Sequence, residues 1–178
     1  MKKYLPIFLL LVAALPAATE SPRVTRAVLS PMEKSLDGRI QRLWEDNPLA
    51  LMGPTRGVYL EGYGAVFTTE VNLVSAPLGL MAHTHTKEEK DRHRARKIER
   101  RPQLLKVLRT ALMESAALLD TVPMEEQVVI VAFLSVYPWE DAKGLPGQVT
   151  LQAPRKKLLE VKRAGGAGLE AAVRVIEY

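Results

Sequence analysis

The sequence predicts an α+β fold, a mostly antiparallel sheet with helices packed on one face, in a single domain after a signal peptide. Two observations lead to this class. The predicted strands come in adjacent pairs separated by helical segments, and the strand expected at 65–74 alternates between apolar and polar residues, as a strand with one solvated face does. A chain of 178 residues that is 47% hydrophobic and 25% charged can build such a core.

The first residues have the pattern of a secretory signal peptide. Lys2 and Lys3 precede an apolar run at 5–15, and the small residues Ala17 and Ala18 follow it. The run is shorter than the ~20 residues that cross a bilayer, so we expect it to be cleaved rather than to anchor the chain.

This leader sets the expected organisation of the chain. We expect a signal peptide at 1–18, an exposed lead-in at 19–29 and a single α+β domain at 30–178. The mature protein is then periplasmic or secreted, and it does not span the membrane after cleavage.

The first helix of the domain is expected at 30–47. Ser30 can cap its N-terminus, Pro31 suits its first turn, and Glu33 completes a capping box. Apolar residues recur at helical spacing and predict one buried face: Met32, Leu36, Ile40, Leu43 and Trp44. Asn47-Pro48 ends the helix.

Two strands follow, at 58–60 and 65–74, and a tight turn at 61–64 joins them. A second helix opens with a capping box formed by Thr86 and Glu89. Its first half is almost wholly charged and its second half carries an apolar face. Pro102 between them either kinks one long helix or begins another.

The remaining elements are three strands and one helix. The segment at 128–136 is apolar on both alternations and predicts a central strand covered on both faces. We expect a short strand at 148–152, a basic helix at 154–163, a flexible break at 164–168 and a last strand at 173–178.

Composition excludes several classes of function. The chain has no cysteine, which excludes disulfides, thiol catalysis and Cys-ligated zinc. Its formal charge is +5, and removal of Lys2 and Lys3 with the leader lowers it to +3. No serine lies in a motif typical of nucleophilic hydrolases.

Three histidines form the best candidate for a metal site. His83 and His85 point to the same side of an extended segment and could both reach one Zn²⁺ or Cu²⁺ ion, with His93 or Glu89 as a third ligand. The alternative is that these histidines are solvated residues at the start of a basic helix. No cofactor other than this possible metal is indicated.

The segment 87–109 carries ten basic and four acidic residues, a surplus of +6. Such a helix can bind an acidic protein or an anionic polymer, and we take Arg92, Arg94, Arg96 and Lys97 as candidate binding residues. The alternative is a solvated face with i,i+4 pairs such as Glu88 with Arg92. Nucleic acid is not expected, since no aromatic residue alternates with the basic ones.

A loop at 137–144 combines two aromatic and two acidic residues. Tyr137 and Trp139 are candidate binding residues, because aromatic faces near carboxylates suit sugars. Glu140 or Asp141 could act as the acid of a hydrolase of an envelope polymer, but neighbouring side chains usually diverge. In the alternative interpretation, Trp139 covers a sheet edge.

Two segments resemble a group of exported bacterial proteins of no assigned function. They are 51–64, which reads LMGPTRGVYLEGYG, and 140–152, which begins EDAKGLP. The resemblance implies export and a single α+β domain, and it implies no activity and no site residue.

Together these observations favour a non-enzymatic binding module of the bacterial cell envelope, with an envelope protein or an anionic polymer as its partner. The alternatives are a metal-binding protein or metal-assisted enzyme that uses His83 and His85, and a hydrolase that acts on an envelope polymer.

Overall fold

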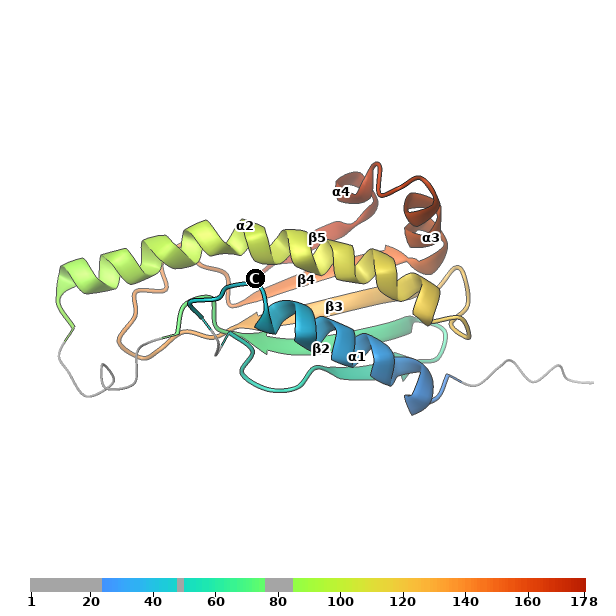
Figure 1. Ribbon diagram of the computed structural model, residues 1–178, viewed down its shortest axis with the longest axis horizontal. Coiled ribbons are helices and arrows are strands. Elements are labelled where there is room, and N and C mark those ends of the chain that lie inside the picture. Colours follow the sequence, from blue (N-terminus) through green and yellow to red (C-terminus); the bar gives the residue numbers. More distant parts are fainter. Residues whose placement is uncertain (1–23, 48–49, 76–84) are drawn as a thin grey trace, which may run out of the picture.

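The computed structural model describes residues 24–47, 50–75 and 85–178, and in them the chain forms an α+β fold of two layers (Figure 1). The elements are α1 (Arg26–Gln41), β1 (Arg56–Leu60), β2 (Gly64–Val71), α2 (Lys87–Leu118), β3 (Gln127–Leu134), β4 (Gln148–Pro154), α3 (Arg155–Arg163), α4 (Leu169–Ala172) and β5 (Arg174–Glu177). The predicted fold class is confirmed. No helix in these residues is long and apolar enough to cross a bilayer.

The five strands form one sheet in sequence order, β1-β2-β3-β4-β5. Neighbouring strands are antiparallel except β2 and β3, which run parallel because the long helix α2 connects them. The predicted hairpin turn is present, and Gly64 has a φ of 137°. A Cβ there would lie 1.9 Å from the carbonyl oxygen of Gln127, so the parallel pairing requires glycine at this position.

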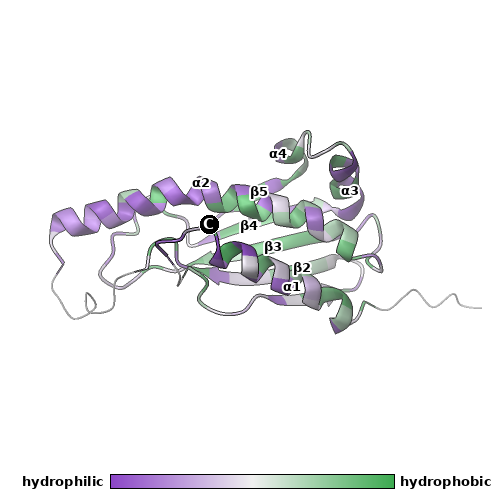
Figure 2. Ribbon diagram, in the orientation of Figure 1, coloured by the Kyte–Doolittle hydropathy of each residue, from purple (hydrophilic) through white to green (hydrophobic). Residues whose placement is uncertain are grey.

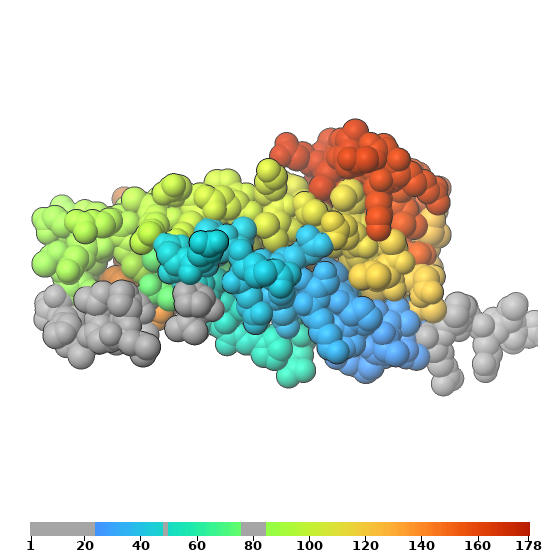
Figure 3. Space-filling view, in the orientation of Figure 1, coloured from blue at the N-terminus to red at the C-terminus, as the bar shows by residue number. Residues whose placement is uncertain are grey.

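Both α1 and α2 cover the same face of the sheet, and their atoms lie against each other on that face (Figures 1 and 3). Strand residues that point toward the helices are fully buried, among them Phe67, Ile130 and Leu151. The expectation that β3 is covered on both faces holds only in part. On the face away from the helices Val129 is 3% exposed, whereas Phe133 is 45% exposed, because none of the described helices packs on that face.

Helix α1 begins at Arg26, four residues earlier than Ser30, the predicted cap. Thr25 is the N-cap, so Pro31 lies inside the helix and residues 26–29 are helical rather than part of a lead-in. Proline there removes one backbone hydrogen bond. Burial of Leu29 offsets this loss, because the added turn carries the apolar stripe of the helix further over the sheet. The signal peptide and residues 19–23 lie outside the described residues.

The side chains of α1 cover the outer edge of β1. Glu33 accepts hydrogen bonds from the Gly57 N–H (2.6 Å) and from Arg26, and Arg26 also donates to the Gly57 carbonyl. Asp37 accepts from the Thr55 N–H. These bonds satisfy edge groups that would otherwise be free to pair with another strand.

Helix α2 continues through Pro102 as one helix of 32 residues, and its predicted capping box of Thr86 and Glu89 is confirmed. At 1.5 Å per residue it is about 48 Å long, more than the sheet can cover. Its hydrophilic N-terminal half therefore extends beyond the strands, whereas its C-terminal half carries the hydrophobic residues that pack on them (Figure 2).

The later elements follow the sequence expectations closely. Strands β3, β4 and β5 and helix α3 begin and end within two residues of the predicted bounds. The predicted break at 164–168 is a run of turns, which leads into the short helix α4 that the sequence did not indicate.

We predict that Glu33→Ala lowers the free energy of unfolding by about 2 kcal/mol, because it leaves the Gly57 N–H and Arg26 without their acceptor. Glu45→Ala is the control, since Glu45 is exposed and has no ion pair in the described part of the chain. It should change stability by less than about 0.5 kcal/mol. Equal effects in urea unfolding would contradict the role of Glu33.

Candidate functional site

The N-terminal half of α2 contacts the segment 135–147, which joins β3 to β4. At the centre of this contact Lys97 Nζ lies 2.5 Å from Glu140 Oε2, and the two side chains are only 2% and 3% exposed. Lys97 also donates to the Ser135 carbonyl at 2.9 Å. Burial lowers the pKa of Lys97, and its hydrogen bond and ion pair with Glu140 oppose that effect.

Four aromatic rings pack around this ion pair. The rings of Trp139 and Tyr137 are stacked with centroids 5.6 Å apart, and Trp139 also stacks on His85 at 3.8 Å. His93 meets Trp139 edge-on at 5.0 Å, and Lys97 Nζ lies 5.7 Å from the centroid of Tyr137. We call these four rings with Lys97 and Glu140 the ring–ion-pair cluster.

His93 is largely buried within the cluster, and its Nδ1 lies 3.5 Å from Glu140 Oε1. Burial lowers the pKa of His93, the charge of Glu140 raises it, and the charges of Lys97, His85 and Arg96 lower it further. The net effect is a pKa below the usual value, so the imidazole is held neutral over a wider pH range.

Several buried polar atoms of the cluster have no hydrogen-bond partner among the described residues. They are His85 Nε2, both ring nitrogens of His93, Trp139 Nε1 and Glu140 Oε1. Two of them, His93 Nδ1 and Glu140 Oε1, lie 3.5 Å from each other without hydrogen-bond geometry. An unpaired buried polar atom costs about 1–3 kcal/mol, and such groups are rare in folded proteins. Five of them in one cluster therefore indicate a place where a bound group can supply partners.

Five of the ten basic residues at 87–109 form ion pairs with acids from other segments. Arg94 donates to the Lys143 carbonyl (2.7 Å) and to Asp141, and Arg96 pairs with Asp46 at 2.7 Å. Arg100 pairs with Asp46 as well, and Arg101 pairs with Glu177. Among the candidate cations, Arg92 alone has no hydrogen bond or ion pair in the part of the chain described here.

The expected i,i+4 pairs of α2 are absent from the described residues. Glu89 accepts from the Thr86 N–H in the capping box instead of pairing with His93, and Glu88 does not pair with Arg92. The charge run is thus balanced by long-range pairs, which attach loops to the helix.

The histidines do not form a metal site within the described residues, where no group of three histidine or carboxylate ligands converges. His85 stacks on Trp139 and His93 meets the same ring edge-on, and His83 lies outside the described residues. A zinc or copper site that includes His83 therefore stays a prediction.

The neighbouring carboxylates diverge, as expected. Glu140 is buried against Lys97, whereas Asp141 is half exposed and accepts from Arg94 and the Lys143 N–H. Trp139 stacks on His85 and Tyr137, whereas the alternative interpretation placed it over a sheet edge.

The structure brings Lys97, Tyr137, Trp139, His85 and His93 together, although the sequence suggested them as three separate features. The sequence did not indicate that Glu140 is the ion-pair partner of Lys97. One signal could have found the burial of Lys97: it and Arg100 continue the spacing of the apolar stripe that starts at Leu104.

Comparison of the chain with protein-family models, with curated proteins and with solved structures found no match.

We predict that the protein loses stability as the pH falls below about 6.5, the usual pKa of histidine. The unfolded chain then takes up a proton on His93 before the folded protein does, because burial lowers the pKa of His93 in the fold. The loss is at most about 1.4 kcal/mol per pH unit, since one proton is involved. Unfolding in urea at pH 7 and pH 5.5 measures it.

His93→Gln is the matched variant, because it keeps the other histidines and removes this titration alone. It should lose less stability than the unmodified protein between pH 7 and pH 5.5. Equal losses would show that His93 does not cause the pH dependence.

We further predict that Lys97→Met destabilises the protein by about 3–5 kcal/mol, because it leaves Glu140 buried without its counter-charge. The double variant Lys97→Met/Glu140→Met should recover most of that loss, since it removes both charges. If the double variant is no more stable than the single one, the two residues are not coupled.

Proposed function

We propose that this protein is a non-enzymatic binding module of the bacterial cell envelope and that the ring–ion-pair cluster holds its ligand, a hydroxyl-rich glycan chain. The observation that carries the proposal is the set of five unpartnered polar atoms among stacked rings. The leader at 1–18 supports export to the compartment where such polymers occur.

The chemistry of the cluster matches a sugar better than an anion. Trp139 Nε1 can donate to a hydroxyl oxygen, Glu140 Oε1 can accept from a hydroxyl, and each histidine nitrogen can do one or the other. Stacked indole and phenol rings provide apolar faces for the C–H groups of a sugar ring. The cations nearest these rings are already paired, Lys97 with Glu140 and Arg94 with Asp141.

The five atoms are covered, so a ligand reaches them after the segment 135–147 shifts. That segment contains exposed residues between Pro138 and Gly144 and is attached to α2 by Lys97 and Arg94. Ligand binding should therefore change the surroundings of the Trp139 ring, and the fluorescence of Trp139 would report that change.

The pairing of the carboxylates supports binding over hydrolysis. A glycoside hydrolase needs one carboxyl group that is free to donate its proton and a second one across the scissile bond. Glu140 is held by a lysine and Asp141 by an arginine.

We predict that Trp139→Ala reduces co-sedimentation of the protein with insoluble cell-wall glycan by tenfold or more, because it removes the stacking face and one donor. Trp44→Phe is the matched control, since Trp44 is the other tryptophan of the chain and donates to Gln103 instead of to a residue of the ring–ion-pair cluster. Its co-sedimentation should stay within twofold. Unchanged co-sedimentation of Trp139→Ala would refute the proposal.

The contribution of charge is tested separately with Arg92→Glu. Lys162→Glu on α3 is its matched control, because both residues are exposed helical cations without an ion pair among the described residues. If the ligand is an uncharged glycan face, neither substitution should change co-sedimentation appreciably. Loss of binding in Arg92→Glu alone would identify the partner as anionic and overturn the choice of a neutral sugar face.

A further inference from the structure

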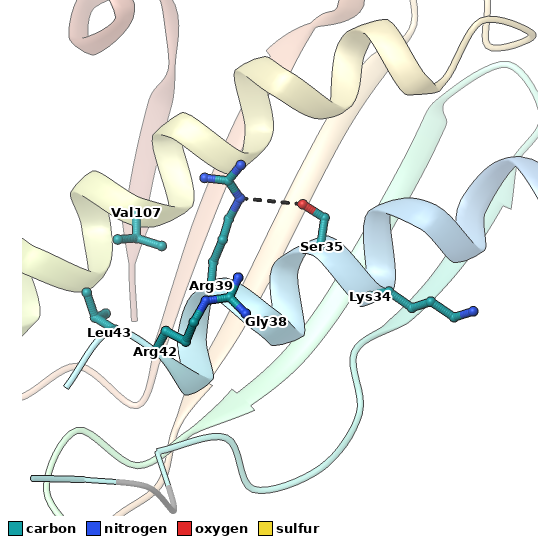
Figure 4. Close-up of a pocket in the computed structure, with 7 residues that line it drawn as sticks. All are labelled: Lys34, Ser35, Gly38, Arg39, Arg42, Leu43 and Val107. Atoms are coloured by element: carbon teal, nitrogen blue, oxygen red, sulfur yellow. Dashed lines mark hydrogen bonds between the residues drawn. The ribbon is translucent and has the colours of Figure 1, made fainter. Parts of the chain in front are cut away.

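A groove of about 520 Å³ lies between α1 and α2, away from the ring–ion-pair cluster (Figure 4). Its lining is strongly basic, and the residues are Lys34, Ser35, Gly38, Arg39, Arg42, Leu43 and Val107. All but Val107 belong to α1 and the residues that directly follow it. The expected basic surface was on α2, whereas this one lies mainly on α1.

The positive charges of the groove are only partly balanced. Arg39 pairs with Glu114 of α2, and its Nε donates to the Ser35 hydroxyl at 3.4 Å. Within the described residues Lys34 and Arg42 form no ion pair. Three cations and one carboxylate leave a surplus of two positive charges in a concave surface, where a bound anion would be attracted by both.

Gly38 gives the groove its shape. Glycine in the middle of a helix is less stable than alanine, so its presence at this position needs another reason. A Cβ on Gly38 would lie 3.2 and 3.3 Å from the two terminal nitrogens of Arg42. The guanidinium of Arg42 therefore lies over Gly38, folded back onto the helix beside Arg39, instead of extending into solvent (Figure 4).

We propose that this groove binds a phosphate group, with the guanidinium groups of Arg42 and Arg39 and the Ser35 hydroxyl as its donors. Guanidinium groups form paired hydrogen bonds with phosphate oxygens, and a hydroxyl can add a third bond. Leu43 and Val107 border the same groove, so the phosphate can carry an apolar or uncharged substituent. The phosphate is either free in solution or the headgroup of an anionic lipid.

The test titrates the purified protein with inorganic phosphate by calorimetry and, separately, measures its flotation with vesicles of phosphatidylglycerol and of phosphatidylcholine. We expect Arg42→Gln to weaken the binding that is found by tenfold or more. Lys162→Gln on α3, a partnerless exposed cation in the described structure, is the control and should bind as the unmodified protein does.

Gly38→Ala separates binding from folding. The added Cβ displaces the Arg42 guanidinium, so affinity should fall severalfold, whereas the melting temperature should stay the same or rise because alanine favours the helix. Trp139→Ala should keep its phosphate affinity, since the groove does not include the ring–ion-pair cluster.

The phosphate titration and the vesicle flotation distinguish the two sources of phosphate. Binding of inorganic phosphate that depends on Arg42 supports a soluble ligand. Arg42-dependent flotation with phosphatidylglycerol vesicles, but not with phosphatidylcholine vesicles, supports a lipid headgroup. Absence of both kinds of binding, or equal affinities of Arg42→Gln and the unmodified protein, would overturn the proposal.

Discussion

The packing of one helix, α2, determines most of this structure. A single stripe along it runs from the fully buried Leu112 and Leu108 to Arg100 and Lys97, which are buried cations that bond the backbone just beyond the ends of β2 and β3. The C-terminal half is therefore held by apolar contact, and the N-terminal half is held by ion pairs. Buried cations need counter-charges, so this half requires acids from elsewhere in the chain.

Those acids come from three different segments. Asp46 follows α1, Glu140 and Asp141 lie between β3 and β4, and Glu177 ends β5. Each pair brings a loop or a strand end to the helix. The basic helix is thus a structural element that orders the segments around it, and five of its ten cations are used in these pairs.

The same arrangement leaves the sheet covered on one face. Both long helices lie on that face (Figure 1), and the side chains of α1 also satisfy the outer edge of β1. Glu33 is the acceptor for the Gly57 N–H at this edge. Burial raises the pKa of Glu33. Hydrogen bonds from Arg26 and Gly57 and the charges of Arg26 and Arg56 lower it by more, so the net pKa lies below the usual value. The carboxylate stays ionised where the edge needs an acceptor.

The two proposed binding surfaces differ in chemistry because they use different parts of α2. At its N-terminal half the helix meets a loop rich in aromatic residues, and the two cations that contact this loop, Lys97 and Arg94, are paired with its acids, which leaves stacking faces and uncharged polar atoms. Near its middle the helix meets α1, where Arg42 and Lys34 keep their charge. The first surface suits a neutral polyhydroxylated ligand and the second suits a phosphate.

Local and periodic features were predictable from the sequence alone. The capping box at Thr86, the hairpin turn before Gly64, the alternation of β2 and the fold class all depend on residues close together in the chain, and all are confirmed. The leader and its cleavage also rest on sequence, and they stay predictions. Only the tertiary structure decided where α1 begins, that β3 is exposed at Phe133, and that Lys97 pairs with Glu140. These depend on contacts between distant segments, and neither periodicity nor propensity says which charge a buried cation will meet.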